Sequence, residues 1–168
     1  LCSENPEFNF YEQNHPIYNY PDLLPMSKFK RSSLVETNFA SGCVIGDSDF
    51  KRCVLGVRSI IGDECSFENV VMMGADNYEV VDSLKIPVGV GSNSKIENAI
   101  IDKNARIGKD VQLSPTGVED GWADEGENVY VRDGIVVVVK NGIVPDGTRI
   151  GELKCLLQID VYSGNFSV

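Results

Sequence analysis

The sequence has few side chains that could perform acid–base or metal chemistry. It contains one histidine among 168 residues, His15. A zinc site made of three histidines is therefore excluded, and a histidine acting as general base in the body of the chain is disfavoured. No G-x-S-x-G segment, phosphate-binding P-loop or cysteine–histidine zinc spacing occurs either. The sequence predicts no catalytic residue and no metal site in this chain.

Cysteine pairs are also lacking. None of the five cysteines belongs to a C-x-x-C pair, and their odd number argues against a full disulfide framework. Two interpretations remain open. The thiols are reduced and packed in the interior, or one of them is an exposed redox group, for which Cys2 is the best candidate.

Positive charge and long apolar runs are scarce as well. The formal net charge is −10, which is the wrong sign for non-specific binding of nucleic acid. No apolar run approaches the roughly 18 residues of a membrane-spanning helix. We therefore expect no nucleic-acid partner and no membrane partner, and an anionic ligand needs a local group of lysines and arginines.

Aliphatic residues recur every six positions from about residue 34, and glycine often follows them. The periodic apolar residues are Leu55, Ile61, Phe67 and Met73; Val90 and Ile96; Ile101, Ile107 and Leu113; and Val138, Val144 and Ile150. The glycines that follow are Gly46, Gly56, Gly62, Gly74, Gly91 and Gly108, which suits corners that need a positive φ. This hexapeptide repeat predicts an all-β fold, a left-handed parallel β-helix of about five coils with about eighteen residues each.

The chain divides into three parts. Residues 1–32 are rich in proline and aromatic residues and predict an extended linker or interface segment, with plain disorder as the alternative. Residues 33–150 form the β-helix domain, and residues 151–168 are a C-terminal extension of uncertain structure. Two stretches without the repeat, 75–87 and 114–128, predict loops that leave the β-helix; the second is acidic and carries Trp122, which we expect to dock on a surface.

Four segments carry a family resemblance: "FYEQNHPIYNYPDLLP", "VLGVRSIIGDECSFENVVMMGADNYE", "IPVGVGSNSKIENAIIDKNARIG" and "DGIVVVVKNGIVPDGTRI". Over about residues 5–150 the chain resembles the C-terminal domain of ADP-glucose pyrophosphorylase (glucose-1-phosphate adenylyltransferase) of plants, algae and cyanobacteria. That family makes ADP-glucose and pyrophosphate from ATP and glucose 1-phosphate for starch or glycogen synthesis. Its catalytic domain begins with a glycine-rich nucleotide loop, which is absent here.

The resemblance implies a regulatory and assembly domain that is inactive by itself. It implies Mg²⁺ in the catalytic domain and no cofactor in this one. The implied partners are other subunits of the same enzyme, in a homotetramer or heterotetramer. The implied location is the plastid stroma for a plant or algal protein and the cytoplasm for a bacterial one.

The resemblance also implies an allosteric activator site. A lysine in "IIDKNARIG" and one shortly after "SGIV" bind 3-phosphoglycerate in the family, and they correspond to Lys103 and Lys140, 37 residues apart. We add Arg106 and Arg132 to the expected site because they are close to these lysines in sequence. Asp133 stands where the family usually has serine, and we expect its negative charge near Lys140.

Two other functions remain open at this stage. One is a free-standing hexapeptide-repeat acyltransferase or binding scaffold, which a nucleotidyltransferase domain upstream in the gene would exclude. The other is the equivalent domain of another sugar-nucleotide pyrophosphorylase, which "GADNYE" and "IIDKNARIG" disfavour. Without the resemblance, a lysine at a coil corner is most simply solvated surface.

Overall fold

The computed structural model describes residues 12–18, 23–80 and 85–153, and this part of the chain is built from short strands and turns. It contains no helix that is long and apolar enough to cross a membrane. The strands are β1 (Lys28–Phe29), β2 (Ser32–Val35), β3 (Asn38–Phe39), β4 (Val44–Ile45), β5 (Ser48–Lys51), β6 (Val54–Leu55), β7 (Ile60–Ile61), β8 (Ser66–Met72), β9 (Gly89–Val90), β10 (Lys95–Ile101), β11 (Arg106–Ile107), β12 (Gln112–Leu113), β13 (Val129–Arg132), β14 (Ile135–Val138), β15 (Ile143–Val144) and β16 (Arg149–Ile150).

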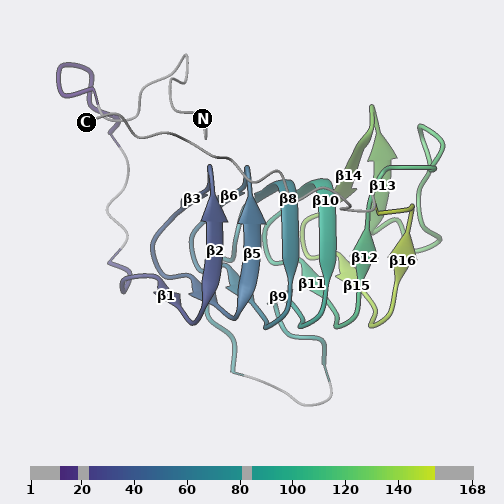
Figure 1. Cartoon of the computed structure of the whole chain (residues 1–168), viewed down its shortest axis with the longest axis horizontal. Coiled ribbons are helices and arrows are strands. Elements are labelled where there is room, and N and C mark those ends of the chain that lie inside the picture. Colours follow the sequence, from purple (N-terminus) through teal and green to yellow (C-terminus); the bar gives the residue numbers. More distant parts are fainter. Residues whose placement is uncertain (1–11, 19–22, 81–84, 154–168) are drawn as a thin grey trace, which may run out of the picture.

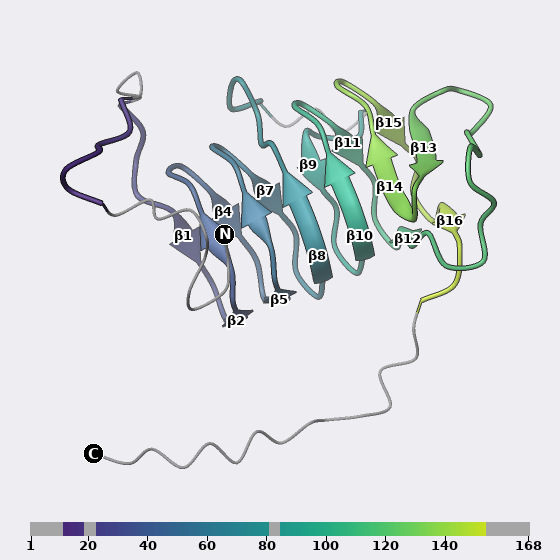
Figure 2. The ribbon, with the colours of Figure 1, turned by 90° about the horizontal axis from the view of Figure 1, so that it is seen from above.

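The strands wind into a parallel β-helix with three faces (Figures 1 and 2). A six-stranded sheet in the order β1-β4-β7-β9-β11-β15 forms one face. A ten-stranded sheet covers the other two, because β8 and β10 each continue around a corner and pair with strands on both faces. Apart from the β13–β14 hairpin, the strands in the described residues pair in parallel, as the sequence predicted.

Three ladders of inward-facing side chains make the core, one behind each face. Residues of one ladder occupy the same register position on successive coils, so each coil buries the apolar face of the next. The ladders are Phe39, Leu55, Met72, Ile101 and Val138; Leu34, Phe50, Phe67, Ile96, Leu113 and Ile150; and Phe29, Ile45, Ile61, Val90, Ile107 and Val144.

Most periodic residues predicted to face inward do so, but Met73 does not. Eight of them, Leu55, Ile61, Phe67, Val90, Ile96, Ile101, Ile107 and Leu113, are at most 5% exposed. Met73 is 47% exposed, and Met72 fills the core in its place. Met72 lies five residues after Phe67, and not six, because Asn69 turns the corner with φ of 55°. Uninterrupted coils are therefore sixteen or seventeen residues long, not eighteen.

The repeated glycines have a different cause from the predicted one. Gly91 has an ordinary φ, but a Cβ there would lie 2.6 Å from the carbonyl of Gly108 on the next coil. Glycine is thus needed where neighbouring backbones approach closely, and of the six predicted glycines only Gly74 has a positive φ, of 81°. Elsewhere, polar residues such as Asn69 and Asn98 adopt the left-handed conformation at the corners.

The structure describes only parts of the two predicted end segments, 1–32 and 151–168. Strand β1 already lies within the stretch expected to be a linker, so the first coil begins before residue 33. Of the linker aromatics, Tyr18 is 93% exposed and most others lie outside the described residues, as do Cys2 and the extension from 154 onward. The three cysteines in the described residues, Cys43, Cys53 and Cys65, are buried thiols.

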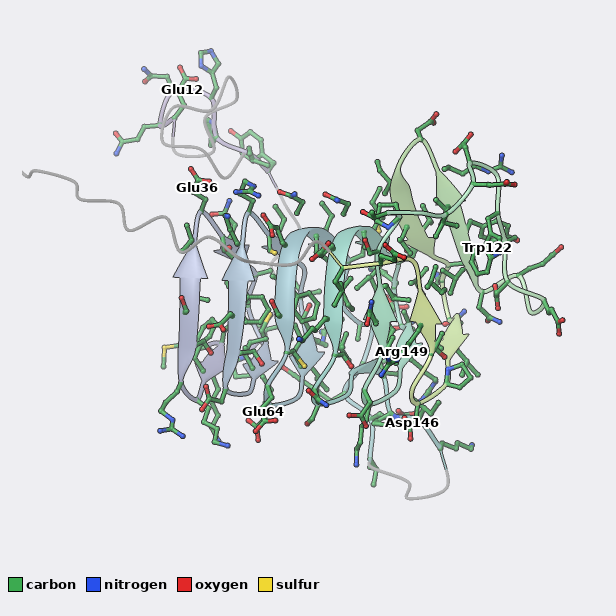
Figure 3. All side chains as sticks on the ribbon, turned by 45° about the vertical axis from the view of Figure 1, so that its right-hand side comes forward. Glu12, Glu36, Glu64, Trp122, Asp146 and Arg149 are labelled. Atoms are coloured by element: carbon green, nitrogen blue, oxygen red, sulfur yellow. The ribbon has the colours of Figure 1, made fainter. Side chains whose placement is uncertain are left out.

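Both predicted loops leave the β-helix. In Figure 1 the loop after β8 extends below the coils, and the 114–128 loop leaves them at the C-terminal end, where it leads into the β13–β14 hairpin. In the acidic stretch 114–128, Asp124 accepts the N–H of Val129 at 2.6 Å and so closes a turn. Trp122 is 36% exposed and lines a hollow of about 360 Å³ with Val118 and Arg149. Trp122 and Arg149 are both labelled in Figure 3, at the C-terminal end of the β-helix.

Candidate anion-binding site

Lys103 and Lys140 lie at the same corner of adjacent coils. Strand β14 pairs in parallel with β10, with Val138 beside Ile101, and each lysine follows its strand by two residues. The N–H of Asn141 donates to the carbonyl of Lys103 at 3.0 Å, which continues the register through the corner. The two backbones are therefore separated by about 4.8 Å, the spacing of neighbouring strands. The two lysines are 37 residues apart in sequence because the coil between them is lengthened by the 114–128 loop and the β13–β14 hairpin.

The segment 74–79, "GADNYE", leaves the coil below and lies against this corner. Asp76 accepts a hydrogen bond from Lys103 Nζ at 3.1 Å and one from Asn104 Nδ2 at 2.9 Å, while its N–H donates to Asn104 Oδ1 at 2.8 Å. The hydrogen bond from Asn104, then that from Lys103 and the charges of Lys103 and Lys140, hold the pKa of Asp76 below its usual value. Asp76 is thus an anion at neutral pH, and both lysines contribute to stabilising its charge.

Arg106 is also paired with a carboxylate of this segment. Its Nη1 and Nη2 donate to Glu79 at 2.8 and 2.6 Å, and Nη1 donates to the carbonyl of Ile86 at 2.8 Å. The Arg106 hydrogen bonds, followed by that from the N–H of Val88, lower the pKa of Glu79 to about 2. The same pair raises the pKa of Arg106. The guanidinium therefore links Glu79 with Ile86 on the far side of the loop.

An open hollow of about 290 Å³ lies between this segment and the facing coils, and neither Lys103 nor Lys140 is among its lining residues. Its polar lining includes Asp76, Glu79, Asn104, Arg106 and Asn141. Tyr78 completes one wall, and its hydroxyl donates to the carbonyl of Gly42 at 2.8 Å. The arrangement has cations and amide donors, which are groups that suit the binding of an anion. Among the described residues, no three His, Cys, Asp or Glu side chains are grouped closely enough to hold a metal ion.

The structure does not bring Arg132 to the other three expected site residues. Arg132 pairs with Ile135 at the start of β14, whereas Lys140 follows the other end of that strand. At about 3.3 Å per residue, the two lie roughly 15 Å apart along the chain. Asp133 is in the hairpin turn, where its N–H donates to Asp120 Oδ1 at 2.6 Å. The expected negative charge near Lys140 is thus at the distant end of β14.

Sequence reasoning did not single out the two carboxylates of the site. Asp76 and Glu79 are part of the quoted "GADNYE" motif, which supported the family resemblance but was not assigned to the site. One signal was available: the motif follows directly on the coil that stacks beneath Lys103, and it starts the loop. An acidic segment leaving the corner below a pair of lysines is a candidate counterion.

The domain is a three-sided coil of short parallel strands, with apolar ladders inside and charged side chains at one corner. These features define the hexapeptide-repeat solenoid class. Residues 22–149 match the family model described as the GLGC left-handed parallel beta-helix domain. Because the match covers most of the chain, the chain belongs to this family, the C-terminal β-helix domain of ADP-glucose pyrophosphorylase, which is a nucleotidyltransferase. The family description gives the coil as left-handed, which confirms the predicted fold.

Proposed function

We propose that this chain is the regulatory and subunit-assembly domain of a glucose-1-phosphate adenylyltransferase that serves starch or glycogen synthesis. Lys103 and Lys140 bind a phosphorylated three-carbon acid such as 3-phosphoglycerate, with Arg106 at the edge of the site. The observation that carries the proposal is the position of the two lysines at one corner of adjacent coils, on the motifs that the family resemblance assigns to activator binding. Arg132 stays outside the proposed site because of its position on the hairpin.

The physical properties of the corner suit such a ligand. Two ammonium groups on neighbouring coils provide local positive charge in a chain of net charge −10. Charge-assisted hydrogen bonds from lysine to phosphate or carboxylate are among the stronger polar contacts in proteins. Arg106, Asn104 and Asn141 line a hollow of about 290 Å³ next to the two lysines, and this volume is at the small end of ligand pockets, which suits a three-carbon acid better than a nucleotide.

Binding by the isolated chain tests this proposal. Calorimetric titration with 3-phosphoglycerate is expected to show one site whose affinity falls with added salt, because the attraction is electrostatic. Glycerol 3-phosphate, which lacks the carboxylate, is the matched control and should bind about tenfold more weakly, as expected for one lost charge-assisted contact. Equal binding of the two ligands, or binding that salt does not change, contradicts the proposal.

Catalysis and assembly are proposed to involve other parts of the enzyme. The first coil offers an apolar surface: Phe29, Leu34 and Val35 are 38–49% exposed. Strands β1 and β2 end the sheets there with unpaired edges among the described residues, and such edges favour association. We expect a nucleotidyltransferase domain with its Mg²⁺ and further subunits as partners, in the plastid stroma or a bacterial cytoplasm.

Two measurements test this division of roles. The full-length subunit with its partner is expected to form a tetramer in light scattering, and a stable monomer at micromolar concentration would contradict the assembly role. The chain alone is expected to produce no ADP-glucose from ATP and glucose 1-phosphate, since it has no glycine-rich phosphate loop. Turnover by the purified chain would contradict that role.

A further inference from the structure

Two of the cations at the proposed site are already paired with carboxylates from one short segment. Lys103 Nζ lies 3.1 Å from Asp76 Oδ1, and Arg106 Nη2 lies 2.6 Å from Glu79 Oε1. A carboxylate is the same kind of group that the proposed ligand presents. Because an ammonium or a guanidinium has a limited number of donors, an incoming anion meets groups that are already engaged.

The segment that carries these acids is fixed on both sides of Asp76. The N–H of Ala75, which is buried, donates to the carbonyl of Val57 at 2.9 Å. On the other side, the Tyr78 hydroxyl is bonded to the carbonyl of Gly42, where an added Cβ would lie 2.5 Å from the Tyr78 oxygen. Asp76 and Glu79 are therefore held over the corner by backbone and tyrosine contacts that do not depend on the cations.

We propose that Asp76 and Glu79 are built-in competitors of the activator, which binds by displacing them from Lys103 and Arg106. The inference rests on the proposed function and adds how the same site is regulated. Lys140, which is exposed and makes no ion pair within the described residues, is the cation that meets the incoming anion first. Exchange of Lys103 from Asp76 to the ligand then completes binding, so the strength of the internal pairs sets the activator concentration needed.

A purely positioning role predicts the opposite effect. If Asp76 and Glu79 oriented the cations for the ligand, their removal would weaken binding. If they compete with the ligand, their removal strengthens it. Both ion pairs are partly exposed, with side-chain exposures of 42% and 43% for the first pair and 25% and 34% for the second. Each is therefore a modest contact, which an activator at millimolar concentration can replace.

The test is calorimetric titration of the 168-residue chain with 3-phosphoglycerate. Asp76→Asn and Glu79→Gln keep the side-chain shape and are each expected to tighten binding about two- to fivefold, with about tenfold for the double variant. Glu64→Gln is the matched control: it removes one negative charge from an exposed side chain at a different corner and should change the affinity less than twofold. Thermal unfolding followed by circular dichroism checks that each variant is folded.

The outcomes separate this inference from the proposed function. Binding by Asp76→Asn and Glu79→Gln that is no tighter than binding by Glu64→Gln, or is weaker than wild type, overturns the competition. Lys103→Ala provides the distinction. If it weakens binding while the amide variants show no gain, only the competition fails. If Lys103→Ala binds like wild type, the proposed site fails and the competition with it. In the Lys103→Ala background, Asp76→Asn should give no further gain, because the pair that it would release is already gone.

Discussion

Ile101→Ala is expected to lower the free energy of unfolding by about 2–5 kcal/mol, the range for large-to-small substitutions in a closely packed core. Ile101 is 0% exposed and lies in its ladder between Met72 and Val138. The truncation removes apolar contacts and leaves a cavity that the neighbouring coils cannot fill without shifting their registered backbones. Chemical denaturation followed by circular dichroism measures the effect.

The control is the same substitution at an exposed isoleucine one coil later. Ile143 belongs to β15 and is 49% exposed, so Ile143→Ala should cost less than about 1 kcal/mol. Because a solenoid is stabilised by contacts between neighbouring coils, the Ile101 variant should also loosen the coils on both sides of it. Equal losses at the two positions would show that Ile101 is not a core residue and that the ladders are wrongly placed.

Lys103→Ala and Lys140→Ala are each expected to raise the half-saturating concentration of 3-phosphoglycerate by about tenfold or more. A hydrogen bond to a charged group contributes about 1.5–3 kcal/mol, and each variant removes one such contact. The measurement is activation of the assembled enzyme over a range of activator concentrations. Lysine-to-arginine variants should restore the affinity only in part, because a planar guanidinium does not place its donors as an ammonium does.

Lys109→Ala is the matched control for this prediction. Lys109 is an exposed lysine a few residues further along the same coil, at a different corner, and its removal changes the net charge by the same amount. Its half-saturating concentration should stay within about twofold of wild type. If both site variants also stayed within that range, the lysines would be solvated surface and the activator site would have to lie elsewhere.

The periodicity of the sequence was sufficient to predict the core but not the length of each coil. Residues such as Ile96 and Ile107 were found because inward-facing positions must be apolar on every coil. Met73 was placed wrongly because the corner at Asn69 shortens the spacing of core residues from six to five. The shortening depends on the backbone conformation of Asn69, which an apolar pattern does not reveal. The glycines were found correctly, but their cause is the close approach of two coils, which a single repeat does not reveal.

The candidate site was only partly predictable from the sequence. Lys103 and Lys140 were found from motifs, and their proximity follows from the parallel register of β10 and β14. Asp76 and Glu79 were missed because their contacts join a loop to corners 27 residues further along the chain, and apolar periodicity carries no information about such contacts. Arg132 was included on sequence proximity alone, and the turn of the β13–β14 hairpin places it at the opposite end of the strand.

The most direct test of the anion site is to locate the bound ligand. The backbone amides of Asn104 and Asn141 report on the corner, since they donate to the carbonyls of Gly74 and Lys103 at 3.0 Å each. Asn69 and Asn98, joined by a side-chain hydrogen bond of 2.9 Å at another corner, serve as internal references. Nuclear magnetic resonance of the ¹⁵N-labelled chain during titration with 3-phosphoglycerate is predicted to shift the first two amides saturably and to leave the references unchanged. Saturable shifts confined to other parts of the chain, or no shifts at all, would contradict the assignment of this corner as the activator site.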